Sequence, residues 1–285
     1  MNPATHPATG QPLASGSLRL DHELQVTMRL ALEAGTLLRD RQKQPLQVGH
    51  KANGEIVTPA DLASNELICR GLASAFREDT ICSEEGPAVT ADSTSSRVWI
   101  VDPLDSTSNY VQGGDQYSLS IGLAIDGEAV LGVVYNPSRH ELFAGYRGLG
   151  ATWNGVPVRA TLAAPPHRPR LLVSSKEWKR GVNSAGACQI EPMASMAYKL
   201  ARVAAGREDG ALSLKTRKPW GTCAGTALVL AAGGRVTSLD EQPLHFDCRG
   251  PRTFHGLVAA GPKLHAQVLE LAAGLKACMP ARHSA

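Results

Sequence analysis

Trp99-Ile100-Val101-Asp102-Pro103-Leu104-Asp105-Ser106-Thr107 is the stretch of the chain that says most about its fold. Its apolar residues predict a buried strand that ends at Asp102, and a helix is expected to begin at Ser106 and Thr107. Asp102 and Asp105 therefore stand three residues apart where a strand meets a helix. Such a turn can aim both carboxylates at one point.

The residue types in this stretch suit a metal ion and a phosphate. Mg²⁺ prefers hard oxygen ligands, and Asp102, Asp105 and the carbonyl of Leu104 can supply several of them. A helix N-terminus at Ser106 and Thr107 would add backbone N–H groups for a phosphate. The alternative is structural: Asp105 caps the helix and Asp102 is the solvated end of the strand. The motif taken alone leaves both interpretations open.

Two more acidic groups and a lysine precede this stretch. Thr58 can cap a helix that has Pro59 at its first position, and Asp61 is either the acid of a capping box or a functional carboxylate. Glu84 follows a short apolar strand, so it is either a third metal-directed carboxylate or part of an exposed acidic turn. Lys51 by itself is a solvated lysine.

In their order and spacing these pieces resemble the inositol monophosphatase superfamily, which includes 3′(2′),5′-bisphosphate nucleotidases and some fructose-1,6-bisphosphatases. The W-I-V-D-P-L-D-x-T signature is highly specific, and the resemblance runs from about residue 20 to 275. The segments that carry it are Lys51, Ile56–Asp61 with Glu66, Ser83–Glu85, Trp99–Thr107, Ala224-Gly225 and Ala232–Thr237.

The resemblance implies a layered αβαβα fold and a Mg²⁺-dependent phosphatase site, with Mn²⁺ as a possible substitute. It implies that phosphate rests on backbone N–H groups and that water attacks without a covalent enzyme intermediate. The implied metal ligands are Glu84, Asp102, Asp105 and the carbonyl of Leu104, the implied catalytic residues are Asp61, Glu84 and Thr107, and the implied phosphate or substrate residues are Ser106, Thr107, Ser195 and Lys215. For Ser195 an ordinary helix N-cap is an equally good interpretation.

Two positions depart from the family pattern. The family has glycine where this chain has Ser106, which requires the backbone there to tolerate a Cβ. In Trp220-Gly221-Thr222-Cys223-Ala224-Gly225, Gly221 stands where an aspartate normally completes the second metal site. The alternative function is therefore a catalytically weakened member of the family with a binding or regulatory role.

The substrate is expected to be a small phosphorylated metabolite. Inositol-specific members carry an acidic residue at the position of Leu214, so inositol phosphate is less favoured than a nucleoside 3′,5′-bisphosphate or a sugar phosphate. The basic residues Lys215, Arg217 and Lys218 could face a second phosphate. They could equally form a solvated basic loop.

The order of predicted elements divides the chain into three parts. Residues 1–18 are expected to be a flexible leader, residues 19–165 a metal-binding α+β domain with an antiparallel sheet, and residues 166–285 an α/β domain that completes the active site. The boundary is placed at the proline-rich linker Ala163–Pro166. Helices are predicted over residues 20–41, 195–205 and 222–232, and in segments that begin at residues 58 and 262. Strands are predicted over residues 80–83, 98–101, 117–125, 129–135, 141–146, 171–174 and 210–214, and around Val236 and Leu257.

Composition excludes several other classes of protein. A formal charge of +3 without a lysine or arginine run argues against a nucleic-acid polymer as partner, and no apolar run reaches the roughly 18 residues of a membrane span. Six scattered cysteines without a C-x-x-C pair predict reduced thiols and a cytoplasmic location. The resemblance implies a homodimer.

Overall fold

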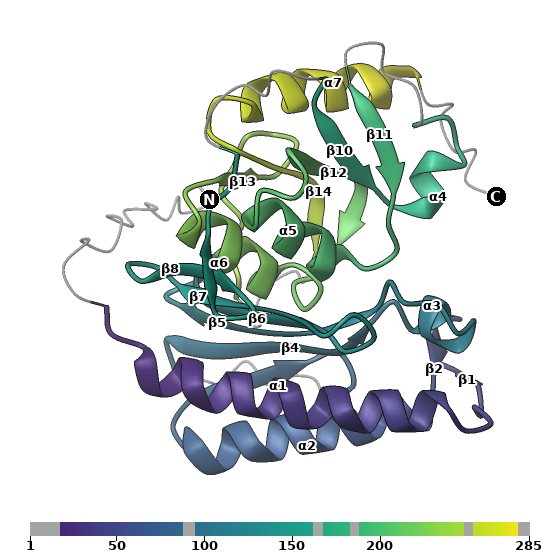
Figure 1. The fold of residues 1–285 in the computed structure, drawn as a ribbon, viewed down its shortest axis with the longest axis vertical. Helices are drawn as coiled ribbons and strands as arrows, with labels where there is room; N and C mark the ends of the chain where they lie inside the picture. The colour runs from purple at the N-terminus through teal and green to yellow at the C-terminus, as the bar shows by residue number, and fades with distance from the viewer. Residues whose placement is uncertain (1–17, 88–94, 162–167, 183–187, 248–252, 279–285) are drawn as a thin grey trace, which may run out of the picture.

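The protein is arranged in five layers (Figure 1). The computed structural model describes residues 18–87, 95–161, 168–182, 188–247 and 253–278. Helices α1 (Asp21–Gln42) and α2 (Pro59–Ala75) cover one face of a seven-stranded sheet, and helices α5 (Met196–Ala204) and α6 (Cys223–Ala231) separate it from a five-stranded sheet. Helix α7 (His265–Cys278) covers the outer face of the second sheet. The predicted αβαβα arrangement is confirmed.

The seven-stranded sheet is the meander that the sequence predicted, with two further strands. Among the described strands, β3 and β4 run parallel, and the other neighbours are antiparallel. Strands β8 and β9, which were not predicted, extend the sheet at its far edge. In spatial order the strands are β3 (Thr80–Ser83), β4 (Arg97–Asp105), β5 (Ser118–Ile125), β6 (Glu128–Asn136), β7 (Glu141–Tyr146), β8 (Gly150–Trp153) and β9 (Val156–Val158).

The five-stranded sheet is mixed. Strand β10 runs parallel to both of its neighbours, as the predicted α/β alternation requires, but β14 pairs antiparallel with β12 and with β13. The predicted last helix begins at His265 instead of Pro262. The strands in spatial order are β11 (Gln189–Pro192), β10 (Arg170–Val173), β12 (Gly210–Arg217), β14 (Phe254–Ala260) and β13 (Arg235–Thr237). Short elements outside the two large sheets are β1 (Gly49–His50), β2 (Ile56–Val57), α3 (Thr107–Val111) and α4 (Ser175–Trp178).

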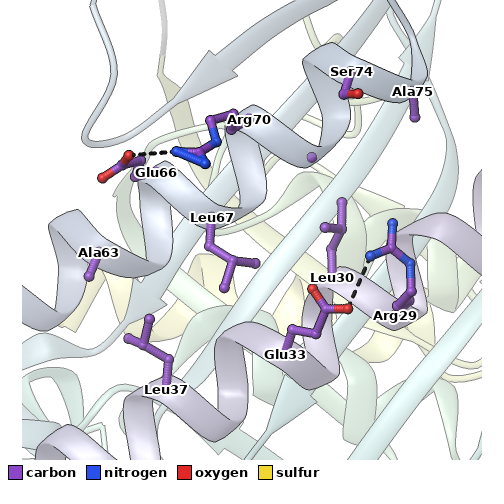
Figure 2. A pocket seen from close by; sticks show the side chains of 11 residues that line it. Arg29, Leu30, Glu33, Leu37, Ala63, Glu66, Leu67, Arg70, Ser74 and Ala75 are labelled. Carbon is purple, nitrogen blue, oxygen red and sulfur yellow. Dashed lines mark hydrogen bonds and ion pairs between the residues drawn. The ribbon is translucent and has the colours of Figure 1, made fainter.

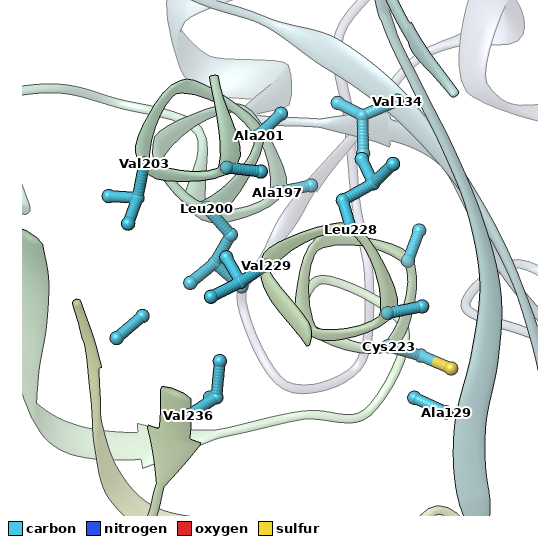
Figure 3. Close-up of a cluster of buried hydrophobic side chains, with 14 of the residues drawn as sticks. Ala129, Val134, Ala197, Leu200, Ala201, Val203, Cys223, Leu228, Val229 and Val236 are labelled. Carbon is cyan, nitrogen blue, oxygen red and sulfur yellow. The ribbon is translucent and has the colours of Figure 1, made fainter. Parts of the chain in front are cut away.

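Helix α6 is apolar on all sides because both of its faces are covered. It lies against β5 and β6, where a Cβ at Gly132 would stand 2.1 Å from the carbonyl oxygen of Ala224 and one at Gly122 2.8 Å from the nitrogen of Ala224. The glycines therefore let the helix approach the sheet closely. Figure 3 shows Leu228 near Val134 on one side of α6. In the described part of the chain, no helix is long and apolar enough to cross a membrane.

The outer face of the first helical layer carries a groove of about 660 Å³ between α1 and α2. Figure 2 shows its floor and its two charged pairs, Arg29 with Glu33 on α1 and Arg70 with Glu66 on α2. Each pair is satisfied within its own helix.

One prediction about the cysteines is wrong. Cys82 takes part in a disulfide bond, whereas Cys69, Cys188 and Cys223 are free thiols. Spacing along the chain gave no sign of this bond, because pairing depends on which segments the fold brings together. The flexible leader, apart from Leu18, and the boundary at residues 165 and 166 fall largely outside the described residues, and the domain division stays a prediction.

Candidate active site

A β-bulge brings Asp102 and Asp105 to the same face of the first sheet. In a regular strand, residues three apart point to opposite faces. Here Asp102 pairs with Ser120 and Asp105 pairs with Ser118, so β4 contains one more residue than β5 between the two pairs. The strand therefore continues to Asp105, and the prediction that it ends at Asp102 is wrong. The extra residue places both aspartates beside serines that share a face of β5.

Asp102 is buried, with 3% of its surface exposed. Burial raises its pKa well above the ordinary range, and the negative charges of Glu84 and Asp105 raise it further. The backbone N–H of Leu104 donates a hydrogen bond of 3.2 Å to it. A buried carboxylate among other acids needs a cation or a proton to offset its charge.

Asp61 is the acid of the capping box, and its other carboxylate oxygen contacts Thr107, while a catalytic role stays a prediction. Its Oδ2 accepts hydrogen bonds from the backbone N–H and the hydroxyl of Thr58, at 2.8 and 2.6 Å, which completes the capping box of α2. Its Oδ1 accepts a 2.8 Å hydrogen bond from the hydroxyl of Thr107. Burial raises the pKa of Asp61, although the hydrogen bonds from Thr58 and Thr107 act in the opposite direction.

Lys51 holds two acidic residues at the end of β3. Its ammonium group forms an ion pair with Glu84 at 3.1 Å and a second one with Glu85. Burial raises the pKa of Glu84, and the positive charge of Lys51 opposes that shift. The interpretation of Lys51 as a solvated lysine is wrong, because the fold places it between two carboxylates that are 33 and 34 residues away in sequence.

Asp105 is turned towards the start of α5. Its Oδ2 accepts hydrogen bonds from the hydroxyl of Ser195 at 2.6 Å and from the backbone N–H of Ala197 at 2.7 Å. Ser195 is fully buried and also accepts a 3.0 Å hydrogen bond from the backbone N–H of Tyr198, as an N-cap does. The N-cap interpretation of Ser195 is therefore confirmed. A substrate role for Ser195 stays a prediction.

The donor set suits a hard divalent cation, but its oxygens do not converge on one ion. Among the residues that the structure describes, no three His, Cys, Asp or Glu side chains are gathered closely enough to hold a metal. The reason lies in the partners just described: Asp105 bonds to α5, and Glu84 pairs with Lys51. The charges of Glu84, Asp105 and Asp61 all reach Asp102, so the chemistry for a cation centred on Asp102 is present.

Gly221 lies beside Asp102. A Cβ built on Gly221 would be 3.6 Å from Oδ2 of Asp102, which is an ordinary contact distance, and apart from Gly221 and its two chain neighbours no other atom of the described residues comes within 4 Å. The carbonyl of Trp220 accepts a 3.3 Å hydrogen bond from Ser120, the residue that pairs with Asp102. An acidic side chain at Gly221 could therefore reach the Asp102 carboxylate without displacing the backbone.

Ser106 occupies the conformation that favours glycine. Its φ of 81° and ψ of 53° lie in the left-handed region, at the N-cap of α3. Its hydroxyl makes no capping hydrogen bond to α3. The chain therefore accepts a Cβ at this position, but in a strained backbone conformation.

The basic residues before Trp220 do not form one free cationic cluster. Arg217 forms an ion pair with Glu177 at 3.4 Å, and Lys218 forms one with Glu55 at 2.8 Å. Their charges are therefore matched within the protein. The half-buried side chain of Lys215 differs from both, because it has no acidic residue at ion-pair distance in the described part of the chain.

Two buried charged residues near the site escaped the sequence analysis. Glu177 belongs to α4, and the spacing of Ser174 and Glu177 is the signal of a capping box that could have revealed it. Lys199 is fully buried in α5, where its ammonium group donates a 2.9 Å hydrogen bond to the carbonyl of Met193. Nothing in its local sequence distinguishes it from an exposed lysine.

Comparison with known proteins shows which family and fold the chain resembles. The profile of the inositol monophosphatase family matches residues 19–276. Nus factor SuhB of Pasteurella multocida is 31% identical over 259 residues, which cover 86% of this chain and 94% of that protein. Inositol monophosphatase 3 of Solanum lycopersicum is 34% identical over 242 residues, covering 80% and 90%. The solved inositol monophosphatase of Anabaena matches the fold with a TM-score of 0.74 at 28% identity, covering 92% of this chain and 97% of that one.

Proposed function

Because this chain belongs to the inositol monophosphatase family, we propose that it is a Mg²⁺-dependent phosphomonoesterase that hydrolyses a small phosphorylated metabolite. One observation carries the proposal above all others. The bulge between Asp102 and Asp105 sets a buried carboxylate among three other acids, and burial followed by the charges of those acids raises the pKa of Asp102. Such a site gains most from a divalent cation.

The proposed roles follow from the contacts of each residue. Asp102, Asp105, Glu84 and the carbonyl of Leu104 would hold Mg²⁺, with Mn²⁺ as the substitute to test. When bound, the metal supplies charge for the phosphoryl oxygens and lowers the pKa of a water molecule.

Asp61 and Thr107 would orient that water. The hydroxyl of Thr107 donates to Asp61, and its lone pairs can accept a hydrogen bond from water. Glu84 would take up the water proton, since burial gives its carboxyl a raised pKa. Backbone N–H groups at Ser106 and Thr107 would receive phosphate oxygens.

The proposed substrates are a nucleoside 3′,5′-bisphosphate or a sugar phosphate, ahead of inositol phosphate. Leu214 supplies no carboxylate for sugar hydroxyls. Its backbone N–H donates a 2.8 Å hydrogen bond to the carboxylate of Glu177. The resemblance further suggests a homodimer. The absence of a lysine or arginine run argues against a nucleic-acid polymer as partner, and a cytoplasmic location stays a prediction.

A second function is favoured by Gly221. The missing carboxylate beside Asp102 would weaken a second metal site, so the chain could be a weakly catalytic member of the family with a binding or regulatory role. Several similar proteins carry the name Nus factor SuhB.

A phosphate-release screen separates the two functions. Purified protein is treated with chelator, supplied with Mg²⁺ or Mn²⁺, and offered nucleotide, sugar and inositol phosphates. We expect metal-dependent release from at least one of them. Activity that survives in chelator would contradict the metal dependence. No release from any substrate at millimolar metal would contradict the phosphatase and favour the regulatory role.

A further inference from the structure

Lys199 is a buried charged residue that the proposed mechanism does not use. Its side chain is fully buried in α5, and in the part of the chain that the structure describes no carboxylate stands at ion-pair distance from its ammonium group. Burial of an unpaired ammonium group costs free energy, so its hydrogen bonds have to offset that cost. Its partners are two backbone carbonyls, that of Met193 at 2.9 Å and that of Ala194 at 3.4 Å.

The segment Met193–Ala194 leads directly into the N-cap of α5. The N–H of Met193 donates to the carbonyl of Val173 at 2.9 Å, which ties the segment to β10. The N–H of Ala194 donates to Oε1 of Gln116 at 3.2 Å. Among the described residues, no donor other than Lys199 reaches the two carbonyl oxygens of the segment. The side chain of Lys199 therefore completes the hydrogen bonding of the residues that precede the helix.

The next residue, Ser195, holds the proposed metal ligand Asp105. Its hydroxyl donates a 2.6 Å hydrogen bond to Oδ2 of Asp105, and the backbone N–H of Ala197 donates to the same oxygen at 2.7 Å. No donor of the described residues reaches Oδ1. The start of α5 therefore binds one carboxylate oxygen of Asp105 and leaves the other available to a cation.

We propose that Lys199 is a positioning residue for the metal site, because it fixes the segment Met193–Ala194 and thereby the place from which Ser195 holds Asp105. Without its ammonium group two carbonyls lose their donor, so the segment is expected to relax and to carry the N-cap with it. Hydrogen bonds that orient a metal ligand commonly change metal affinity by about 10–100-fold. The inference rests on the proposed function, since it takes Asp105 as a metal ligand.

The test measures metal binding in the absence of substrate. Protein freed of metal with chelator is titrated with Mn²⁺ in a calorimeter, as wild type, Ser195→Ala, Lys199→Met and the double variant. We expect Ser195→Ala to weaken Mn²⁺ binding about tenfold and Lys199→Met, which acts one contact further away, about fivefold. Adding Lys199→Met to Ser195→Ala should cost less than about twofold more, because its effect passes through Ser195.

Arg202→Met is the matched control. It removes a cation from the same helix and leaves Glu208 without its ion pair, so it should lower the melting temperature. Because Arg202 does not contact the segment before Ser195, its Mn²⁺ affinity should stay within about twofold of wild type. If Lys199→Met also changes only the melting temperature, Lys199 has a purely structural role and the inference is overturned. Losses of affinity that add up in the double variant would overturn it as well.

Two further measurements keep the outcome decisive. If Lys199→Met does not fold, Lys199→Gln replaces it with a shorter polar side chain, and weaker Mn²⁺ binding supports the inference while unchanged binding overturns it. Phosphate release is measured separately on wild type. A wild type that binds Mn²⁺ but hydrolyses no substrate contradicts the phosphatase and leaves the positioning test in force, whereas one that binds neither Mn²⁺ nor Mg²⁺ overturns both.

Discussion

At the scale of single residues, ionisation of the Asp102 carboxyl has opposite effects on folding and on the proposed metal binding. Its folded pKa is raised by burial and by neighbouring acids, so the stability it contributes is present below its unfolded pKa of about 4 and is lost as pH rises through the folded value. Above its unfolded pKa, the raised folded pKa of Asp102 therefore destabilises the metal-free protein. The same charge is what a metal site requires.

Asp102→Asn is expected to abolish phosphate release and to stabilise the metal-free protein at pH 7 by about 1–3 kcal/mol, because a neutral amide costs less to bury. Activity assays and thermal melts in chelator measure the two effects. Asp40→Asn makes the same change at an exposed position of α1 and should alter neither. Turnover within about threefold of wild type would refute the role of Asp102.

Gly221→Asp is expected to return a ligand to the second metal site. The new side chain would begin 3.6 Å from Oδ2 of Asp102, so it should tighten activating Mg²⁺ and raise kcat at low metal concentration. Without metal, a further carboxylate beside Asp102 should lower the melting temperature. Metal titrations of activity and melts with and without Mg²⁺ measure both. A well-folded variant with unchanged metal dependence would show that Gly221 does not occupy the vacated ligand position.

Ser106→Gly is expected to stabilise the protein by about 0.5–1 kcal/mol. Relief of left-handed strain, about 1–2 kcal/mol, exceeds the entropy that glycine adds to the unfolded chain. Chemical denaturation measures the change. Ser108→Gly, in the helical backbone of the neighbouring turn, should instead destabilise by about 0.5–1 kcal/mol. Equal effects at the two positions would mean that backbone strain at Ser106 is negligible.

At the scale of elements, the position of α6 depends on glycines in the sheet beneath it. Gly132→Ala would place a Cβ 2.1 Å from the carbonyl of Ala224, so α6 or β6 must move. We expect a destabilisation of about 1–3 kcal/mol and weaker activation by Mg²⁺, since Gly221 lies two residues before the start of the helix. Gly274→Ala in α7 meets no atom of the described residues within 4 Å and should stabilise by about 0.5–1 kcal/mol. A Gly132→Ala protein as stable as wild type would contradict the close approach.

Local spacing made many of the elements and one contact of the candidate site predictable. The capping box of Thr58 and Asp61 could be anticipated because its partners are three residues apart. Contacts between distant segments could not be anticipated. The hydrogen bond from Ser195 to Asp105 spans 90 residues, and the ion pair between Lys218 and Glu55 spans 163 residues. The bulge also escaped detection, because the register of β4 is set by its partner strand.

At the scale of the whole molecule, a lysine buried between layers couples stability to pH. Burial lowers the pKa of Lys199 to about 7, the charge of Arg217 adds to this, and Asp105 and Glu177 oppose it. A base whose pKa is lowered by folding contributes stability that is fully present above its unfolded pKa of about 10.5 and is lost as pH falls towards 7.

The free energy of unfolding of the metal-free protein is therefore expected to rise between pH 7 and pH 9 relative to that of Lys199→Met, by up to a few kcal/mol. Denaturant unfolding at several pH values measures the difference between the two proteins, so that other titrating groups cancel. Lys43→Met, at an exposed position after α1, should follow wild type. Parallel pH profiles for wild type and Lys199→Met would show that Lys199 keeps the same proton affinity in both states.

The burial of α6 has a consequence for how the chain unfolds. The helix supplies apolar surface to both sheets at once, so neither sheet can complete its own interior while the other is unfolded. Separation of the two halves would expose a helix that is apolar on every side, together with the face of each sheet that it covers. Such coupling favours a single cooperative transition over a stepwise one. Partly unfolded states in which one half persists should accordingly be scarce, and proteolysis of the native chain should depend on global unfolding or on its loops.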